Sequence, residues 1–140
     1  MLKSSLLHPE ILYALAGAGH GSRILISDGN YPHSTGSNPS AERVYLNLTP
    51  GVLDVPTVLA AIAGAVPIEA AHVMATADRS EPPIWKEFQA ILPEVDLVPL
   101  KRFNFYEAAS ESDVALVVAT GEQRIYANIL LTIGVVPPPA

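Results

Sequence analysis

The run Val114–Ala119, which reads VALVVA, decides the fold class of this chain. It is short, entirely apolar and rich in valine, and a run of this length suits a strand better than a helix. Strands that are apolar at every position are typical of a sheet covered on both faces, whereas a strand with one wet face alternates apolar and polar residues. The run therefore predicts a strand inside a buried sheet.

On either side of this strand, strand-like runs alternate with segments whose apolar residues have helical spacing. Short strand-like runs are Arg23–Ser27, Ala70–Ala75, Val95–Leu100 and Ile129–Ile133, with a further short strand near Val44–Leu46. Apolar residues at helical spacing mark Glu10–Ala18, Val55–Gly64, Pro82–Ile91 and Phe103–Ser110. Asp54 stands where a helix cap is expected, and Pro56 falls in the first turn, which tolerates proline.

This alternation of strands and helices predicts an α/β fold. We expect a three-layer α/β/α domain with a largely buried mixed sheet, and residues 1–140 fit a single domain with no repeat or linker. The stretch Asp28–Pro50 is rich in Gly, Asn, Ser and Pro and reads as a long loop. Loops of that length in small domains tend to be functional.

The composition of the chain excludes or disfavours several classes of protein. The net charge is −6 and the eight Lys and Arg residues are scattered, which disfavours a nucleic-acid partner. The chain has no cysteine, so disulfides, thiolate metal sites and cysteine nucleophiles are excluded. The first residues lack the apolar stretch of a secretory signal, and no run approaches the ~20 apolar residues of a membrane span. We therefore expect a cytoplasmic protein without a membrane partner.

The glycine-rich segment Gly17–Gly21 (GAGHG) lacks the sequence context of a phosphate-binding loop. Such a loop follows a strand and opens a helix, whereas this segment follows a helix and precedes a strand. The glycines instead let the backbone bend sharply around His20, whose imidazole can exchange a proton near neutral pH. A turn histidine that only points into solvent is the alternative.

Polar residues follow two of the expected strands. Asp28 comes directly after Arg23–Ser27, and ligands of open α/β sheets bind at the carboxyl ends of strands. Its carboxylate can hold ligand hydroxyls or orient a histidine, although an aspartate before Gly29 is also a common turn former. Arg102 follows Val95–Leu100 and offers a planar fork of donors that suits neighbouring oxygens, unless it is simply a surface residue.

Tyr126 and Asn128 precede the strand Ile129–Ile133. Two residues apart in extended chain, they are expected to share a face. A tyrosine hydroxyl and an asparagine amide on one face can contact several ligand hydroxyls, though such a pair is also common in purely structural roles.

Taken together, these residues resemble a known family, the L-fucose mutarotases and D-ribose pyranases. The matching motifs, in order along nearly the whole chain, are Gly19-His20, Asp28, Thr120-Gly121-Glu122, Tyr126-Ala127-Asn128-Ile129-Leu130 and Gly134-Val135. Two further segments, His8–Leu12 and Arg102–Glu107, resemble the fucose branch more closely. Each motif is weak alone, but their order and spacing together are specific.

The resemblance implies a cofactor-free and metal-free isomerase that assembles as a ring-shaped homodecamer. In fucose-type members it implies interconversion of sugar anomers, with His20 as the proton donor. Asp28, Arg102 and the Tyr126-Ala127-Asn128 segment would hold the sugar, and Glu122 would support that shell. Acid or base catalysis by one positioned group contributes typically 10²–10⁴-fold, a useful scale because free sugars already open slowly in water.

The choice of sugar rests on fewer residues. The fucose branch has arginine at the position of Arg102, where the ribose branch has histidine, so we expect L-fucose or a related hexose. The loop segments Gly29–His33 and Ser34–Thr49 depart from the fucose pattern, and Ile68–His72 looks more like the ribose branch. The alternatives are a D-ribose pyranase-type enzyme, a non-catalytic sugar-binding or transport-accessory module, and a structural oligomer in which His20 is only a turn residue.

Overall fold

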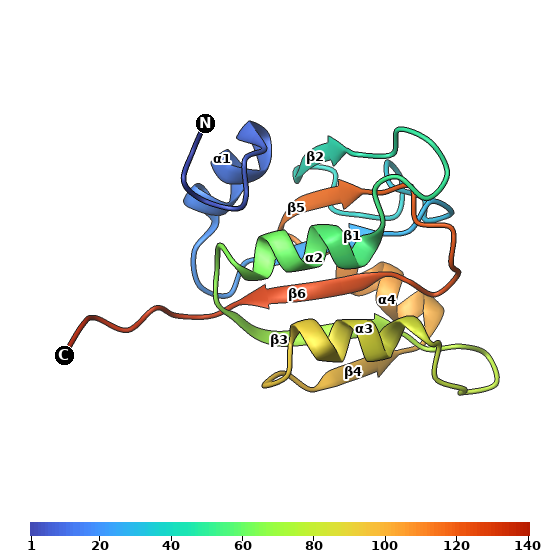
Figure 1. Cartoon of the computed structure of the whole chain (residues 1–140). Helices are drawn as coiled ribbons and strands as arrows, with labels where there is room; N and C mark the ends of the chain where they lie inside the picture. Colours follow the sequence, from blue (N-terminus) through green and yellow to red (C-terminus); the bar gives the residue numbers. More distant parts are fainter.

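The computed structural model describes all 140 residues and contains one six-stranded sheet, in the order β2-β5-β1-β6-β3-β4 (Figure 1). The strands are β1 (Arg23–Ser27), β2 (Glu42–Tyr45), β3 (Ile68–Met74), β4 (Leu97–Leu100), β5 (Val114–Ala119) and β6 (Ile129–Ile133). β6 runs antiparallel to both of its neighbours, β1 and β3, while every other pair is parallel. The sheet is therefore mixed, as predicted.

Four helices cover the two faces: α1 (Pro9–Ala18), α2 (Val55–Ala63), α3 (Ile84–Ile91) and α4 (Arg102–Ala109). Along β1, Ile24 and Ile26 pack with α1, α2 and α3, whereas Leu25 packs with α4 on the other face. Figure 1 shows α2 and α3 in front of the sheet and α4 behind it. The predicted three-layer arrangement is confirmed.

The two faces carry unequal cores. The apolar cluster beneath α1, α2 and α3 contains 22 buried residues, and the cluster on the α4 side contains only 8. The α4 side is completed by the loop after β1, whose Tyr31 is buried there. This thinner layer leaves room for a cavity beside α4.

Local sequence explains where the helices begin. The Asp54 carboxylate accepts a hydrogen bond from the Thr57 amide at 2.9 Å, which confirms the predicted cap of α2. His8 acts in the same way for α1, because its Nδ1 accepts from the Ile11 amide at 3.4 Å. Such caps satisfy backbone donors that have no partner within the helix.

Several predicted boundaries shift by a few residues. The short strand expected near Val44–Leu46 is β2, which starts earlier because Glu42 already pairs with Leu116 of β5. The extended segment expected from Val95 enters the sheet only at Leu97, where its pairing with Ala71 begins. The predicted helix Phe103–Ser110 is α4, one residue earlier, with Arg102 as its first residue.

The predicted long loop Asp28–Pro50 is folded against the sheet. The Tyr31 hydroxyl donates to the Gly36 carbonyl at 2.6 Å, and the Asn38 side-chain amide donates to the Val114 carbonyl at 2.9 Å. The first bond closes a turn within the loop, and the second ties the loop to the amino end of β5, beside Arg23 of β1, so the loop runs back along the sheet from the carboxyl end of β1.

The chain after β6 leaves the sheet as an extended, exposed tail that ends in three prolines before Ala140 (Figure 1). None of the four helices has the length and apolar character that crossing a membrane requires.

We predict that Phe88→Ala destabilises the fold by about 3–5 kcal/mol, because Phe88 of α3 is fully buried in the larger core and its removal leaves a cavity. The measurement is denaturant unfolding followed by circular dichroism. Lys86→Ala, an exposed change on the same helix, should stay within about 0.5 kcal/mol of wild type. If Phe88→Ala lowered the free energy of unfolding no more than Lys86→Ala does, the packing of α3 would be contradicted.

Candidate active site

The antiparallel course of β6 brings two polar residues together. Ile26 near the carboxyl end of β1 pairs with Ile129 at the amino end of β6, so the residues just outside these strands are neighbours. The Asp28 amide donates to the Asn128 side-chain oxygen at 2.7 Å, and both residues are only 3% exposed. This bond leaves the Asn128 amide nitrogen available as a donor to a ligand.

The Asp28 carboxylate is buried and held from two sides. One oxygen accepts from the Asn30 amide at 3.0 Å, and the other accepts from the Ala127 amide at 3.3 Å. Burial raises the pKa of Asp28 above its ordinary value of 3.8, and these backbone hydrogen bonds oppose that rise. Each oxygen keeps a second acceptor position for a ligand hydroxyl.

A cavity of about 220 Å³ lies beside this pair and is called the Asp28 cavity below. Its lining residues come from the loop after β1, the end of β3, α4 and the segment before β6: Asp28, Asn30, Tyr31, Met74, Arg102, Tyr106, Ile125, Tyr126 and Asn128. The structure thus brings together Asp28, Arg102, Tyr126 and Asn128, as expected. The cavity is smaller than the roughly 300–1,000 Å³ of sites for drug-sized ligands, which favours a ligand of one small ring.

Arg102 stands exposed at the edge of this cavity, on the first turn of α4. Its Nε donates to the Tyr106 hydroxyl at 3.2 Å, and its guanidinium carbon lies 5.8 Å from the centre of the Tyr106 ring. The two residues are four apart, so the helix places them on one face. No hydrogen bond within the chain uses the two Nη groups, which leaves them to a ligand.

The segment before β6 is not extended, contrary to expectation. Tyr126 has φ of 57°, in the left-handed region that a bulky residue rarely adopts. Such a backbone costs on the order of 1–3 kcal/mol and is found where surrounding contacts enforce it. The bend still directs Tyr126 and Asn128 to the same cavity, while the fully buried Ala127 contributes its backbone amide.

Two tyrosines of the cavity were not predicted. Tyr31 is 5% exposed, and its ring meets the Phe105 and Tyr106 rings edge-on, with centroids 6.1 and 5.3 Å away. Burial raises the pKa of Tyr31 well above its ordinary value, so its hydroxyl stays protonated at neutral pH. Their signal in the sequence was spacing: Tyr31 follows Asp28 by three residues, and Tyr106 follows Arg102 by one helical turn.

His20 lies elsewhere in the chain. It precedes β1 between Gly19 and Gly21, whose φ angles of 80° and 83° favour glycine, and its side chain is 58% exposed. Its Nε2 lies 3.1 Å from a carboxylate oxygen of Glu69. Asp28 follows the opposite end of β1. Because the strand has five residues that rise ~3.3 Å each, Asp28 lies about 17 Å from the His20 end. The expectation that Asp28 could orient His20 is therefore wrong within one chain.

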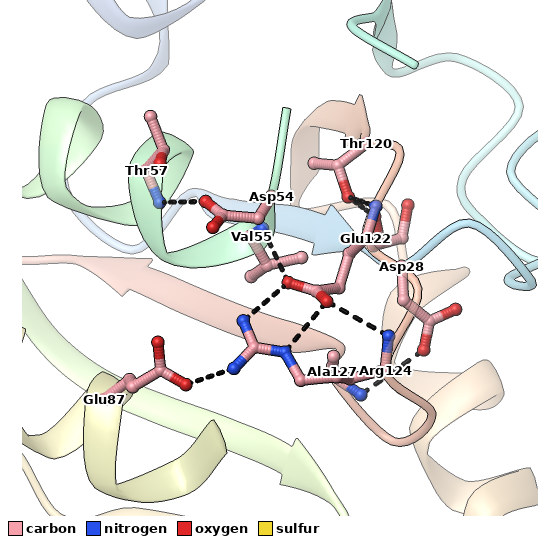
Figure 2. Close-up of polar contacts among 10 residues, drawn as sticks. Asp28, Asp54, Val55, Thr57, Glu87, Thr120, Glu122, Arg124 and Ala127 are labelled. Atoms are coloured by element: carbon pink, nitrogen blue, oxygen red, sulfur yellow. Dashed lines mark hydrogen bonds and ion pairs between the residues drawn. The ribbon is translucent and has the colours of Figure 1, made fainter. Parts of the chain in front are cut away.

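Glu122 is buried but does not line the Asp28 cavity. Its carboxylate binds the side chain of Arg124 and the backbone amide of Val55 at the start of α2 (Figure 2). Burial acts to raise the pKa of Glu122, but these hydrogen bonds outweigh it and hold the pKa below the ordinary value. Any support that Glu122 gives to a sugar site is indirect, through the turn that carries Tyr126.

A larger hollow of about 680 Å³ lies on the other side of Tyr126, lined mainly by residues 76–84. Its lining includes no buried charged side chain, whereas the Asp28 cavity holds two polar residues that are 3% exposed. No group of three or more His, Asp or Glu residues is placed to hold a metal ion. The smaller cavity is therefore the candidate site, with an acceptor in Asp28 and donors in Arg102, Tyr126 and Asn128.

Known proteins resemble this chain in sequence and in fold. The chain is 34% identical to the fucose mutarotase of Mus musculus, covering 91% of this chain and 89% of that protein, and 32% identical to the fucose mutarotase of Homo sapiens, covering 94% and 90%. Among solved structures, Bacillus subtilis RbsD complexed with D-ribose superposes with a TM-score of 0.85 at 26% identity, covering 98% of this chain and 100% of that one.

The fucose mutarotase of Streptococcus pneumoniae in complex with L-fucose has a TM-score of 0.83 and 28% identity, covering 97% of this chain and 100% of that one. These similarities extend over the strands and loops that form the Asp28 cavity. A model of the RbsD / FucU transport protein family matches residues 1–136, nearly the whole chain, and the resemblance first seen in scattered motifs is thereby confirmed: this chain belongs to the RbsD / FucU family.

Proposed function

We propose that this chain is a monosaccharide mutarotase that interconverts the anomers of L-fucose or a closely related free hexose in the Asp28 cavity. The observation that carries the proposal is the convergence of Asp28, Asn128, Arg102 and Tyr126 on one cavity of single-ring size. The mouse and human relatives named fucose mutarotase support the same reaction.

The reaction requires proton transfer at two oxygens of the sugar. The ring opens when its ring oxygen gains a proton and the anomeric hydroxyl loses one, and the aldehyde then closes on either face. Asp28 accepts a hydrogen bond from one sugar hydroxyl, and the Arg102 guanidinium and the Asn128 amide donate to others. A ring held in this way needs only one well-placed acid or base to open 10²–10⁴-fold faster.

His20 is proposed as the proton donor, supplied by a second copy of the chain. Within one chain the length of β1 separates His20 from Asp28, so one chain does not form a site that contains both. His20 is exposed on a glycine-flanked turn, and open space surrounds both glycines, so that turn is accessible to the cavity of a neighbouring copy. A homo-oligomer, in family precedent a decameric ring, follows as part of this proposal.

The second candidate is pyranose–furanose interconversion of D-ribose, which the similarity to Bacillus subtilis RbsD in complex with D-ribose favours. We prefer a hexose because of Arg102. A guanidinium can bridge two neighbouring oxygens of a ring that carries several hydroxyls.

The first test of the function is substrate choice. We expect the protein to accelerate L-fucose anomer exchange more than D-ribose pyranose–furanose exchange, measured by exchange NMR at matched sugar concentrations. Arg102→Lys should lose much of that preference, because an ammonium cannot reproduce the planar fork. Faster D-ribose exchange would favour the ribose candidate, and sugar binding without any acceleration would reduce the protein to a binding module.

The second test concerns the donor. His20→Ala and Asp28→Asn should each lower exchange by about 10²-fold or more. Co-expression of the two variants should restore activity, because random mixing gives about a quarter of the sites an intact histidine from one copy and an intact aspartate from another. Light scattering should show a mass many times 14.8 kDa. Mixed assemblies as inactive as the separate variants would refute donation between copies.

The third test is pH dependence. Burial raises the pKa of Asp28, so this carboxyl gains its proton at a higher pH than an exposed aspartate, and sugar binding should weaken as the pH falls through that value. Calorimetry with L-fucose should give an acid midpoint above 3.8 while circular dichroism shows a folded protein. Asp96→Asn, at an exposed position, should leave the midpoint in place. A midpoint at or below 3.8 would contradict a buried Asp28 in the site.

A further inference from the structure

The strained turn Arg124–Ala127, which carries Tyr126, is held at both ends by buried carboxylates. On the side toward β6, Asp28 accepts from the Ala127 amide at 3.3 Å. On the side toward β5, Glu122 accepts from the Arg124 amide at 3.0 Å. Tyr126, with its left-handed backbone, lies between these two attachments. Figure 2 shows both carboxylates directed at the same short segment of chain.

Glu122 joins this turn to the rest of the fold through Arg124. Its two oxygens accept from the Arg124 Nε at 2.9 Å and from Nη2 at 3.0 Å, which is the paired geometry that a guanidinium makes best. The second of these oxygens also accepts from the Val55 amide, the first residue of α2, at 3.2 Å. Glu122 is 4% exposed, so its charge is desolvated and depends on these donors.

Arg124 also reaches a third element. Its Nη1 forms an ion pair with Glu87 on α3 (Figure 2). One guanidinium therefore connects the buried Glu122 at the start of α2 with the more exposed Glu87 on α3. Arg124 precedes Tyr126 by two residues, so these side-chain contacts anchor the chain at the start of the turn.

We propose that Arg124 is a positioning residue: through Glu122 and Glu87 it holds the turn so that Tyr126 faces the Asp28 cavity. The inference rests on the proposed function, since it assigns Tyr126 to the sugar site. Arg124 itself does not line that cavity. It acts on the sugar only through the conformation of the turn.

The expected signature is a change in KM without a matching change in kcat. When only a fraction of the molecules hold Tyr126 in place, the apparent affinity falls by that fraction, while bound sugar selects the competent turn. A residue needed only for stability behaves differently, because loss of folded protein lowers the maximal rate and leaves KM unchanged. The two roles therefore predict opposite kinetic results.

The test compares four variants by exchange NMR over a series of L-fucose concentrations. Arg124→Ala should raise KM about tenfold with kcat within about twofold of wild type. The KM of Arg124→Lys should lie between those of wild type and Arg124→Ala, because lysine keeps the charge but not the paired hydrogen bonds. Glu87→Gln, which removes only the exposed attachment, should change KM less than Arg124→Ala. Lys86→Ala, an exposed cation beside Glu87, is the matched control and should match wild type.

A second readout does not depend on activity. The chain has five tyrosines, so fluorotyrosine labelling gives a simple ¹⁹F spectrum in which Tyr126→Phe assigns the Tyr126 signal. Arg124→Ala should shift or broaden that signal, and Lys86→Ala should not.

The outcomes separate the two proposals. A wild-type KM in Arg124→Ala, or an unchanged KM with a reduced maximal rate, would overturn the positioning role. An undisturbed Tyr126 signal would do the same. Wild-type protein that accelerates no sugar exchange would overturn the proposed function instead, and the Tyr126 signal would then decide alone whether Arg124 positions the turn.

Discussion

The hydrogen bond from the Asp28 amide to the Asn128 side chain is the contact on which the site depends. It exists because β6 runs antiparallel between β1 and β3 in a sheet that is otherwise parallel. In a fully parallel sheet, the segment before one strand and the segment after its neighbour lie at opposite ends of the strands. Reversal of one strand places the Tyr126-Ala127-Asn128 segment beside the end of β1, and the cavity forms between them and α4.

Two local features of the site are unfavourable on their own. The charged form of Asp28 is disfavoured by burial, and the backbone of Tyr126 is strained. Both are tolerated because neighbouring groups enforce them: backbone amides bind Asp28, and the pair formed by Glu122 and Arg124 fixes the turn. The dense core beneath α1, α2 and α3 offsets such costs and gives the thinner α4 side a rigid support. Proteins commonly break local rules at functional sites and compensate elsewhere.

Much of the fold could be predicted from the sequence because its signals are local. The apolar run Val114–Ala119 and the cap at Asp54 appear in the structure as expected. Asp28 could be placed at a strand end for the same reason. The left-handed backbone of Tyr126 could not be predicted, since tyrosine has no preference for it and the segment is held in part by Asp28, which is distant in the chain.

The relation of His20 to the site was also beyond local sequence. Family motifs place His20 and Asp28 eight residues apart, but the strand between them carries them to opposite ends of the sheet. Spacing places Tyr31 near Asp28 and Tyr106 near Arg102. No local pattern predicts the contact between the two tyrosine rings, because it joins segments far apart in the chain.

The central claim is that one sugar occupies the Asp28 cavity of one copy and meets His20 of another. A crystal structure of the assembled protein with L-fucose tests it most directly. The account predicts a sugar hydroxyl within hydrogen-bond distance of the Asp28 carboxylate, and the ring oxygen within that distance of His20 from a neighbouring copy. L-Fucose bound away from Asp28, or a His20 imidazole that approaches no bound sugar, would contradict it.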